Sequence, residues 1–451
     1  MLHKLPPEFL IAMAREYQLS SDQQDVLLRR FVHHQEYEEI STELETSVGA
    51  CLKRMGQVYK KFGFSSGRKG KEAELRKFLY KEYEEYQKLQ ESQSNLHDSS
   101  SDSHPNLDLG LPYPNGQVAV DSPLYIERYP IEEQCYQEIA RHNALIRIKA
   151  PRQMGKTSLM SRILTHAAQQ YHYQTIDINF QLCDQNFFES LDKLLKYFCA
   201  TVGRKILEHP DNLNDYWDSD FLGSKMSCTS YFEECLLPQV DSCLVIGIDE
   251  VDRVFSIKNT WDIAQEFFGL LRGWHEAGKR GGVWQKLKLV LSYSTEIYIP
   301  LQANQSPFNV GFPVELSEFN FEQVKDLVAR HQLDWQNEDI EQLVNLVGGH
   351  PFLVRLALYH IARGEVALQQ LLANGATETG IYAEHLRCLL VDLEEHQLIN
   401  AMKKVIAPQD STAMTVEECF QLQSKGLTKF EGEQVKARCQ LYHQYFTKQL
   451  A

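Results

Sequence analysis

The chain has 451 residues, of which 43% are hydrophobic, so it is long enough to form two or three domains with cores of their own. Its formal net charge of −15 disfavours loose binding of nucleic acid by the molecule as a whole. Its apolar stretches, such as Leu244–Ile246, are far shorter than the roughly 20 residues that cross a bilayer. The start of the chain contains Glu8 and two prolines, which does not fit a secretory signal. We therefore expect a cytoplasmic protein without a membrane span.

The cysteines are scattered from Cys51 to Cys439, with no Cys-x-x-Cys pair and no cluster with histidine. This spacing argues against a zinc site and against the disulfide framework of a small secreted domain. We expect reduced cysteines, most of them in the core.

Residues 1–90 form the first predicted domain, which should be all helical because apolar residues recur at helical spacing. Three helices are expected, at Leu19–Phe31, Tyr37–Leu44 and Val48–Phe62. On the third helix, the periodicity predicts one apolar face and one polar, basic face. The apolar face consists of Val48, Leu52, Met55, Tyr59 and Phe62. The basic face consists of Lys53, Arg54, Gln57, Lys60 and Lys61.

The basic face belongs to a basic island, because ten Lys or Arg residues stand between Lys53 and Lys81 against two glutamates. A face of this kind can meet phosphates and base edges, and the helices resemble the helix-turn-helix of sigma-like and response-regulator output domains. They also resemble the helix-turn-helix at the N-terminus of vWA-MoxR associated proteins of bacterial conflict systems. Duplex DNA is one expected partner of this face. Docking of a protein on a solvated basic surface is the alternative.

A linker is predicted at residues 91–121, which are rich in Ser, Asp, Asn, Pro and Gly and lack apolar periodicity. After it, short β-rich runs alternate with helical ones. The expected strands are Leu145–Lys149, Tyr173–Phe180, Cys243–Ile248, Leu287–Tyr293 and a weaker Val314–Leu316. Because these strands are apolar on both faces, they predict an α/β core at residues 122–318 with a parallel sheet covered on both sides.

The first strand of this core runs directly into a loop that ends in Gly155, Lys156 and Thr157 and opens a helix. A strand, loop and helix in this order predict a phosphate-binding loop, in which backbone N–H groups and a helix N-terminus hold the phosphates of ATP. Lys156 would reach the β- and γ-phosphates, and Thr157 would bind Mg²⁺. The pattern departs at its first position, where Ala150 replaces glycine. The candidate nucleotide-binding residues of the loop are Ala150, Pro151, Arg152, Gln153, Met154, Gly155, Lys156, Thr157 and Ser158.

Two further strands of the predicted core end in polar residues. The strand Cys243–Ile248 is followed by Asp249, which can hold Mg²⁺, and by Glu250, which can orient the attacking water. The next strand is followed by Ser294 and Thr295, either of which is a candidate to sense the γ-phosphate. An ordinary transition from strand to turn explains these last two residues equally well. The two motifs in correct order predict a site for hydrolysis of ATP with Mg²⁺.

Beyond Glu318 the pattern returns to helices. We expect a helical lid at residues 319–380 and a winged-helix domain at residues 381–451. Two short β-runs, Leu427–Phe430 and Val435–Cys439, flank Glu-Gly-Glu and predict a hairpin. In the lid, Gly-Gly-His-Pro precedes an apolar helix, and a proline at a helix start needs no functional explanation.

Several segments together resemble the AAA-like domain of bacterial, especially cyanobacterial, signalling ATPases of the STAND group of P-loop NTPases. These segments are Tyr125–Arg128, Ala150–Ser158, Ile248–Arg253, Leu270–His275, Ser306–Val310 and Gly348–Pro351. The resemblance spans about residues 123–450 and implies a five-stranded sheet, a helical lid and a winged helix. It also implies that Gly349–Pro351 contacts the nucleotide through Pro351, and that Arg128 lies near the base and phosphates. It favours ATP over GTP.

The sequence thus favours a nucleotide switch, in which ATP bridges core and lid and hydrolysis resets the protein. ATP would promote homo-oligomerisation or expose a surface for a partner signalling or effector protein, in a conflict or regulatory system. A scaffold or DNA-bound adaptor that stays locked on ATP or ADP is the alternative, and Ala150 motivates it. A P-loop kinase is a third interpretation. Spacing alone does not choose between trans-acting and structural roles for Arg253 and Arg272.

Overall fold

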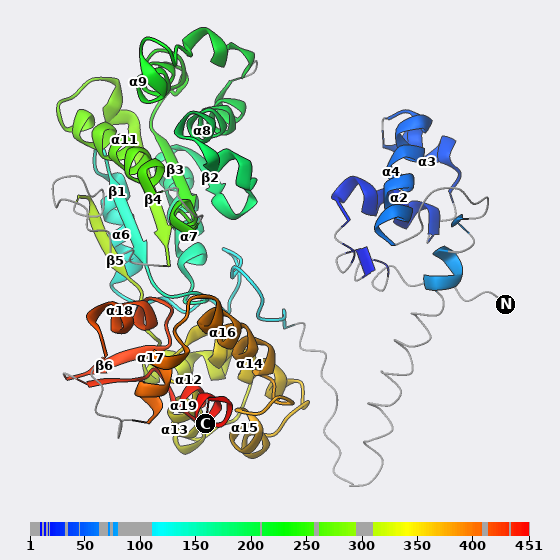
Figure 1. Ribbon diagram of the computed structural model, residues 1–451, viewed down its shortest axis with the longest axis vertical. Helices are drawn as coiled ribbons and strands as arrows, with labels where there is room; N and C mark the ends of the chain where they lie inside the picture. Colours follow the sequence, from blue (N-terminus) through cyan, green and yellow to red (C-terminus); the bar gives the residue numbers. More distant parts are fainter. Residues whose placement is uncertain are drawn as a thin grey trace. The chain divides into compact units, whose positions relative to one another are not determined.

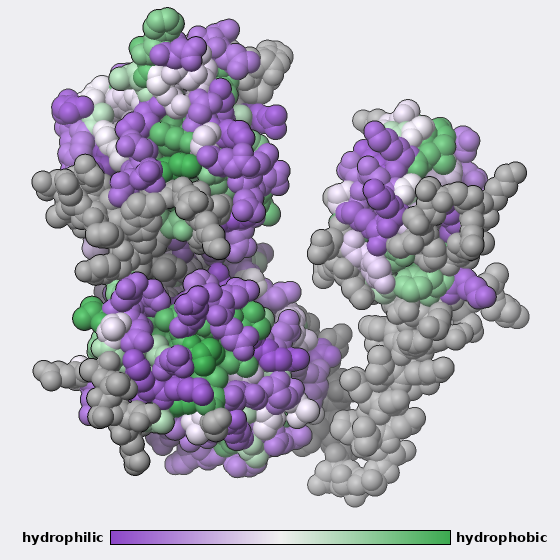
Figure 2. Space-filling view, in the orientation of Figure 1, coloured by the Kyte–Doolittle hydropathy of each residue, from purple (hydrophilic) through white to green (hydrophobic). Residues whose placement is uncertain are grey.

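The computed structural model of the chain forms two compact units, residues Met1–Pro105 and Asn106–Ala451 (Figure 1). The structure describes residues 10, 13–14, 17, 19–31, 35–44, 46–62, 71–72, 75–79, 111–207, 210–256, 261–294, 310–407, 414–432 and 434–450. Helices long and apolar enough to cross a membrane do not occur in these ranges. Figure 2 shows that hydrophilic side chains cover most of the described surface on the face drawn.

The first unit contains the three helices that the periodicity predicts. They are α2 (Ser21–Phe31), α3 (Tyr37–Glu43) and α4 (Val48–Lys61). The Ser47 side chain caps α4 by accepting a hydrogen bond from the Ala50 N–H, at 3.2 Å. Both α2 and α3 pack against α4 and bury one apolar cluster with it.

The buried face of α4 differs from the predicted apolar face. Met55 and Phe62 are buried as predicted, but Cys51 and Val58 take the other core positions, and Leu52 is 50% exposed. The stripe through Cys51 has the same helical spacing as the predicted stripe through Leu52, so the periodicity alone cannot choose between them. The observed rotation buries Cys51, in keeping with cysteine being among the most buried residue types.

The second unit is built on a five-stranded sheet in the order β2-β3-β4-β1-β5, with parallel pairing throughout. The strands are β1 (Leu145–Lys149), β2 (Gln174–Asn179), β3 (Leu244–Asp249), β4 (Leu287–Tyr293) and β5 (Phe312–Glu315). The predicted α/β class and parallel sheet are therefore confirmed. In this order β1 lies between β4 and β5, whereas the next strand of the chain, β2, lies at the far edge. The strand order therefore reverses after β1. Ligands of such sheets usually bind at this point, next to the loop that follows β1.

Helices cover both faces of this sheet. They are α6 (Ile131–Ala140), α7 (Lys156–Tyr171), α8 (Leu191–Ile206), α9 (Gly223–Ser230), α10 (Arg253–Ser256) and α11 (Trp261–Lys279). Val245 packs in the cluster under α6 and α7, whereas Ile246 packs in the cluster under α8 and α11, as the alternation of side chains along a strand requires. Short 3-10 helices lie between these elements at Phe180–Leu182, Gln185–Glu189, Pro210–Tyr216, Leu237–Gln239 and Val283–Lys286, and a π-helix at Tyr231–Leu236 continues α9.

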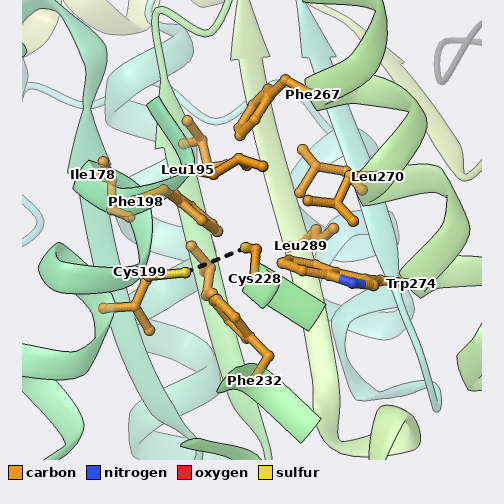
Figure 3. Packing of buried hydrophobic residues seen from close by; sticks show 14 of the residues in the cluster. Ile178, Leu195, Phe198, Cys199, Cys228, Phe232, Phe267, Leu270, Trp274 and Leu289 are labelled. Carbon is orange, nitrogen blue, oxygen red and sulfur yellow. Dashed lines mark hydrogen bonds between the residues drawn. The ribbon is translucent and has the colours of Figure 1, made fainter. Parts of the chain in front are cut away.

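Aromatic side chains fill the cluster under α8 and α11 (Figure 3). The ring of Phe232 lies 4.6 Å from that of Trp274, and the ring of Phe198 lies 5.6 Å from that of Phe232. The Cys199 thiol donates to the Cys228 sulfur at 3.2 Å in the same core. All ten cysteines are free, and most are buried.

Beyond β5, the described residues form helices and one hairpin, joined by turns. The elements are α12 (Phe321–Arg330), α13 (Asn337–Val347), α14 (Pro351–Ala362), α15 (Leu368–Asn374), α16 (Ala383–Glu395), α17 (Ile399–Ile406), α18 (Val416–Ser424), β6 (Thr428–Glu431), β7 (Gln434–Ala437) and α19 (Gln440–Gln449). The strands β6 and β7 pair antiparallel, so the predicted hairpin is present. These elements share one buried cluster, and Figure 1 shows them at the end of the sheet toward which the strands point.

Candidate functional site

The segment Ala150–Ser158, here called the 150–158 loop, makes a tight turn between β1 and α7. Gln153 and Gly155 have positive φ angles of 61° and 94°. Gly155 stands at the N-cap of α7 in the left-handed conformation, which costs residues with a Cβ about 1–2 kcal/mol. The first N–H groups of α7 have no partner within the helix, so the loop and the helix start together form a site for an anion.

Lys156, the first residue of α7, is buried and folds back over the loop. Its ammonium donates a hydrogen bond to the Pro151 carbonyl at 2.9 Å. Burial lowers the pKa of this ammonium, while the nearby carboxylates of Glu250, Asp252 and Asp249 raise it. A cation in this position matches a ligand with several negative charges.

The next residue, Thr157, contacts the end of β3. Its hydroxyl donates to Asp249 Oδ2 at 2.7 Å. Asp249 is 2% exposed, and its second oxygen, Oδ1, has no hydrogen-bond partner among the described residues. A buried carboxylate oxygen without a partner in the protein is usually satisfied by an ion or a water. A hydroxyl beside a carboxylate supplies the oxygen ligands that Mg²⁺ prefers. The residues present therefore fit a magnesium ion.

Glu250 lies directly after Asp249 and has a positive φ of 52°, which is unusual for a residue with a side chain. Burial raises the pKa of its carboxyl, and the Asp252 carboxylate raises it further, whereas Lys156 lowers it. Backbone strain of this kind clusters at functional sites, where the surrounding structure maintains it.

A cavity of about 670 Å³ adjoins these groups. Its far wall comes from α14 and α16, including Phe352 and His385. The predicted residues that line it are Arg128, Gln153, Gly155, Lys156, Thr157, Ser158, Asp249, Glu250 and Pro351. Other predicted residues do not line it: Ala150, Pro151, Arg152, Met154 and Ser294. Thr295 lies outside the described residues.

Among the polar residues of the cavity that are absent from the sequence prediction are Asn179 and Gln181. Asn179 ends β2 and is paired in register with Asp249 on β3. The signal that could have found it is a polar residue at the carboxyl end of the strand beside the carboxylate strand. The predicted strand extends through the apolar Phe180, and this extension conceals the true strand end.

Arg128 is 4% exposed and supports the 150–158 loop from behind. Its guanidinium donates to the Met154 carbonyl at 2.7 Å and lies 4.7 Å from the centre of the Phe319 ring. Burial lowers its pKa. The Glu132 carboxylate accepts hydrogen bonds from the backbone N–H of Arg128 at 2.8 Å and from the Tyr125 hydroxyl at 2.7 Å. Arg128 is thus placed both to hold the loop and to reach the cavity.

The chain around residues 112–120 passes along the cavity, although its composition is that of the predicted linker. The Val118 N–H donates to the Ser158 hydroxyl at 2.9 Å, which ties this segment to α7. At its other end, Tyr113 packs against Tyr359 with ring centres 5.2 Å apart. The segment therefore connects the two walls of the cavity.

The turn that leads into the hairpin also contacts the 150–158 loop. Gly426, just before β6, packs so closely that an added Cβ would lie 2.7 Å from the Pro151 Cβ. Arg438, just after β7, forms an ion pair with Glu318 at 2.6 Å. A movement of the hairpin would therefore displace Gly426 and change its contact with Pro151 in the loop.

Comparison with known proteins gives one family match, since the model of the AAA-like domain matches residues 113–448. A search of curated proteins found no match. Similar solved structures include the Aeropyrum pernix ORC2 protein in its ADPNP-ADP complexes, which is 14% identical with a TM-score of 0.41 and covers 73% of this chain and 96% of its own. Cdc6p from Pyrobaculum aerophilum is 14% identical with a TM-score of 0.37, covering 74% of this chain and 98% of its own.

Domain III of the replication initiation protein DnaA from Thermotoga maritima is 16% identical with a TM-score of 0.33, covering 55% of this chain and 93% of its own. The family match spans the 150–158 loop, the carboxylates after β3 and the helices and hairpin around the cavity. Because this match covers more than half of its length, the chain belongs to the AAA-like domain family.

Proposed function

We propose that the chain binds ATP with Mg²⁺, hydrolyses it, and uses the nucleotide state to control its partners. The observation that carries this proposal is the cavity in which Lys156, the Thr157–Asp249 pair and Glu250 face α14 and α16. Each group suits one part of the ligand: a cation for the phosphates, oxygen atoms for a metal and a carboxylate for water.

The roles follow from these positions. Backbone N–H groups at the start of α7 and the Lys156 ammonium would bind the phosphates. Thr157 and Asp249 would hold Mg²⁺, which supplies positive charge at the phosphate oxygens when bound. Glu250 would orient the attacking water, and Ser294 or Thr295 would respond to the γ-phosphate. Pro351 and Arg128 line the cavity and remain candidate contacts for the nucleotide.

A switch is supported by the separate origins of the cavity walls. The 150–158 loop, the 112–120 segment and α14 with α16 each contribute, and the hairpin packs on Pro151. A ligand that contacts several elements changes their arrangement only if it binds one arrangement more tightly than another. We place the protein with the STAND-type bacterial signalling ATPases, with residues 381–451 as a winged helix. It would act in the cytoplasm of a conflict or regulatory system, through effector proteins or a nucleotide-dependent homo-oligomer.

The test is the nucleotide dependence of the full-length chain. Wild-type protein should bind ADP and a non-hydrolysable ATP analogue, and Lys156→Ala should bind neither. The mass in solution should differ between the two nucleotides if ATP drives oligomerisation. Tight ADP retained through purification, with no phosphate release, would instead favour the scaffold or adaptor that stays locked on nucleotide.

A second function, binding of duplex DNA by the first unit, is favoured by the surface of α4. Lys53, Gln57 and Lys60 are exposed on this helix beside the half-exposed Leu52. Such a surface offers cations for phosphates, an amide for base edges and an apolar group for thymine methyls. Arg54 is less available, because it forms an ion pair with Asp22 at 2.7 Å. Lys61, at the end of the helix, is also exposed. Docking of a protein on the same face is the rival.

A further inference from the structure

The turn that follows β3 contacts the ends of both neighbouring strands. Asp252 Oδ2 accepts a hydrogen bond at 3.0 Å from the N–H of Ser294, which follows β4. The Arg253 guanidinium donates to the carbonyl of Phe180 at 2.9 Å and also to that of Gln181, both of which follow β2. Asp252 in this turn and Arg253, the first residue of α10, therefore hold the strand ends on the two sides of the carboxylate strand.

We propose that Asp252 and Arg253 are positioning residues that set the geometry of the reacting end of the cavity. This inference rests on the proposed hydrolysis of ATP. Neither residue lines the cavity, so neither is a catalytic residue. Each acts through groups that do line it or that follow the neighbouring strand.

The conformation of Glu250 is the first argument. Its positive φ of 52° places a bend between β3 and the turn. A strained residue persists only where its surroundings over-determine it. The preceding residue, Asp249, is held in the sheet, and the following turn is held by the Val251 N–H on the Ser292 carbonyl and by the side chains of Asp252 and Arg253. The two positioning residues thus help to maintain the bend that aims the Glu250 carboxylate into the cavity.

The second argument concerns Asp252 and the end of β4. Asp252 is 7% exposed, and a buried carboxylate is tolerated only when it is hydrogen-bonded. Its bond to Ser294 fixes the backbone at the strand end. The Ser294 hydroxyl is itself buried and finds no hydrogen-bond partner in the part of the chain that the structure describes. The direction of that hydroxyl therefore depends on the backbone that Asp252 holds.

The third argument concerns Arg253 and the end of β2. Asn179 and Gln181 line the cavity on either side of Phe180, which is fully buried. By holding the carbonyls of Phe180 and Gln181, Arg253 fixes the chain that places Asn179 and Gln181 at the cavity. Its guanidinium also lies 5.7 Å from the centre of the Phe188 ring. Because the Arg253 guanidinium is bonded to carbonyls of its own chain, it is not free to reach the nucleotide of another subunit. Arg253 therefore has a structural role and is not a trans-acting arginine finger.

The experiment measures ADP affinity and the steady-state rate of phosphate release in full-length variants. Asp252→Leu and Arg253→Met should lower kcat at least about tenfold, because displacement of reacting groups by about 1 Å is enough to do so. Their Kd for ADP should equal that of the wild type. Asp252→Asn keeps an oxygen that accepts from Ser294 and should restore most of the lost turnover. Asp241→Leu and Arg280→Met, at exposed positions of the same unit, serve as matched controls.

Wild-type kcat in both variants would overturn the proposal, and so would a parallel loss of kcat and ADP affinity. If the wild type itself releases no phosphate, the proposed hydrolysis fails, and hydrogen exchange then decides the positioning role. In that case Arg253→Met should accelerate exchange in the peptide that contains Asn179–Gln181, and Asp252→Leu in the peptide that contains Ser294. Unchanged exchange in both peptides would reject the inference.

Discussion

Thr157 and Asp249 lie 92 positions apart in the chain, yet the hydroxyl of the first donates to the carboxylate of the second at 2.7 Å. This bond joins the first turn of α7 to the end of β3. It uses one carboxylate oxygen and leaves the other, Oδ1, without a partner in the described structure. The arrangement therefore marks a place for a cation next to the 150–158 loop.

Removal of the Thr157 hydroxyl should abolish the effect of Mg²⁺ on nucleotide binding. In Thr157→Val, Asp249 loses its hydrogen bond and the metal loses a ligand, so the Kd for ADP should become independent of Mg²⁺. The free energy of unfolding should fall by about 1–3 kcal/mol, because a buried carboxylate oxygen is left unpaired. Titration calorimetry with Mg²⁺ and with a chelator measures the first effect. Thr157→Ser, which keeps the hydroxyl, is the control, and a Mg²⁺-dependent Kd in Thr157→Val would contradict the metal site.

Gly155→Ala should impair nucleotide binding through the backbone. The positive φ of 94° at Gly155 is strained for alanine by about 1–2 kcal/mol, although an added Cβ would meet its nearest atom, Arg128 Nη2, only at 3.5 Å. The loop should relax away from its turn and lose affinity for ADP about tenfold or more. Gly269→Ala, in the middle of α11 with open space for a Cβ, is the matched control and should bind ADP normally. Equal affinity in both variants would show that the turn is not needed.

The ion pair between Arg438 and Glu318 should couple the hairpin to the nucleotide. Breaking it in Arg438→Met should speed release of ADP and raise hydrogen exchange in β6 and β7. A double-mutant cycle with Glu318→Gln should give a coupling energy of about 0.5–3 kcal/mol. The exposed pair Lys436–Glu431 within the hairpin is the control, since such surface pairs contribute about 0–1 kcal/mol. Additive effects of the two substitutions on ADP release would argue against this link.

Acid should destabilise the second unit through His385. Burial lowers the pKa of His385 to about 4 from an ordinary value of 6.5, so the unfolded chain binds a proton that the folded chain does not bind between these values. Stability is therefore unaffected above pH 6.5 and falls as the pH drops toward 4, by at most about 1.4 kcal/mol per pH unit. Burial also lowers the pKa of His350, whose ring lies 6.1 Å away, so it adds to the same trend.

Urea unfolding of the full-length chain between pH 7 and pH 4 measures this dependence. In His385→Gln, the slope of the free energy of unfolding against pH should become shallower, because the glutamine does not titrate. The hydrogen bond between His385 and the Tyr442 hydroxyl can be kept by the amide. A slope identical to that of the wild type would show that His385 does not contribute.

Duplex DNA should bind the first unit in a salt-dependent manner. Reversal of charge in Lys53→Glu and Lys60→Glu should weaken binding and flatten its salt dependence, by a slope of about one for each phosphate that is no longer neutralised. Fluorescence anisotropy at several salt concentrations measures both. Lys193→Glu with Lys279→Glu changes the net charge equally on the second unit and should have little effect. Without salt-sensitive binding by the wild type at low ionic strength, docking of a protein remains the function of this face.

Local patterns were enough to predict that several residues of the candidate site lie together, and their roles stay predictions. Lys156, Thr157, Asp249 and Glu250 stand where β1 and β3 end, and parallel strands bring such ends to one edge of a sheet. Four of the strands were predicted for the same reason, since each is a short apolar run. The fifth, β5, begins two residues before the predicted Val314–Leu316. These features depend on neighbours in the chain and on rules that hold for any parallel sheet.

Other parts of the site depend on interactions between distant residues and could not be predicted. The composition around Tyr113 is that of a linker, and contacts with distant residues such as Tyr359, Ser158 and Arg162 hold this segment at the cavity. The close approach of Gly426 to Pro151 has no local signal at all. On α4, two stripes with equal spacing competed, so the prediction for Leu52 was wrong. Pairwise packing decides such cases, and periodicity does not contain it.

The most direct test of the account is phosphate release by the full-length chain with Mg²⁺ and saturating ATP, compared between the wild type and Glu250→Gln. Since Glu250 is assigned to the attacking water, the variant should retain the wild-type affinity for ATP but release phosphate about 10²–10⁴ times more slowly. Equal rates in the two proteins, or no release by the wild type at all, would contradict the assignment of this site to hydrolysis.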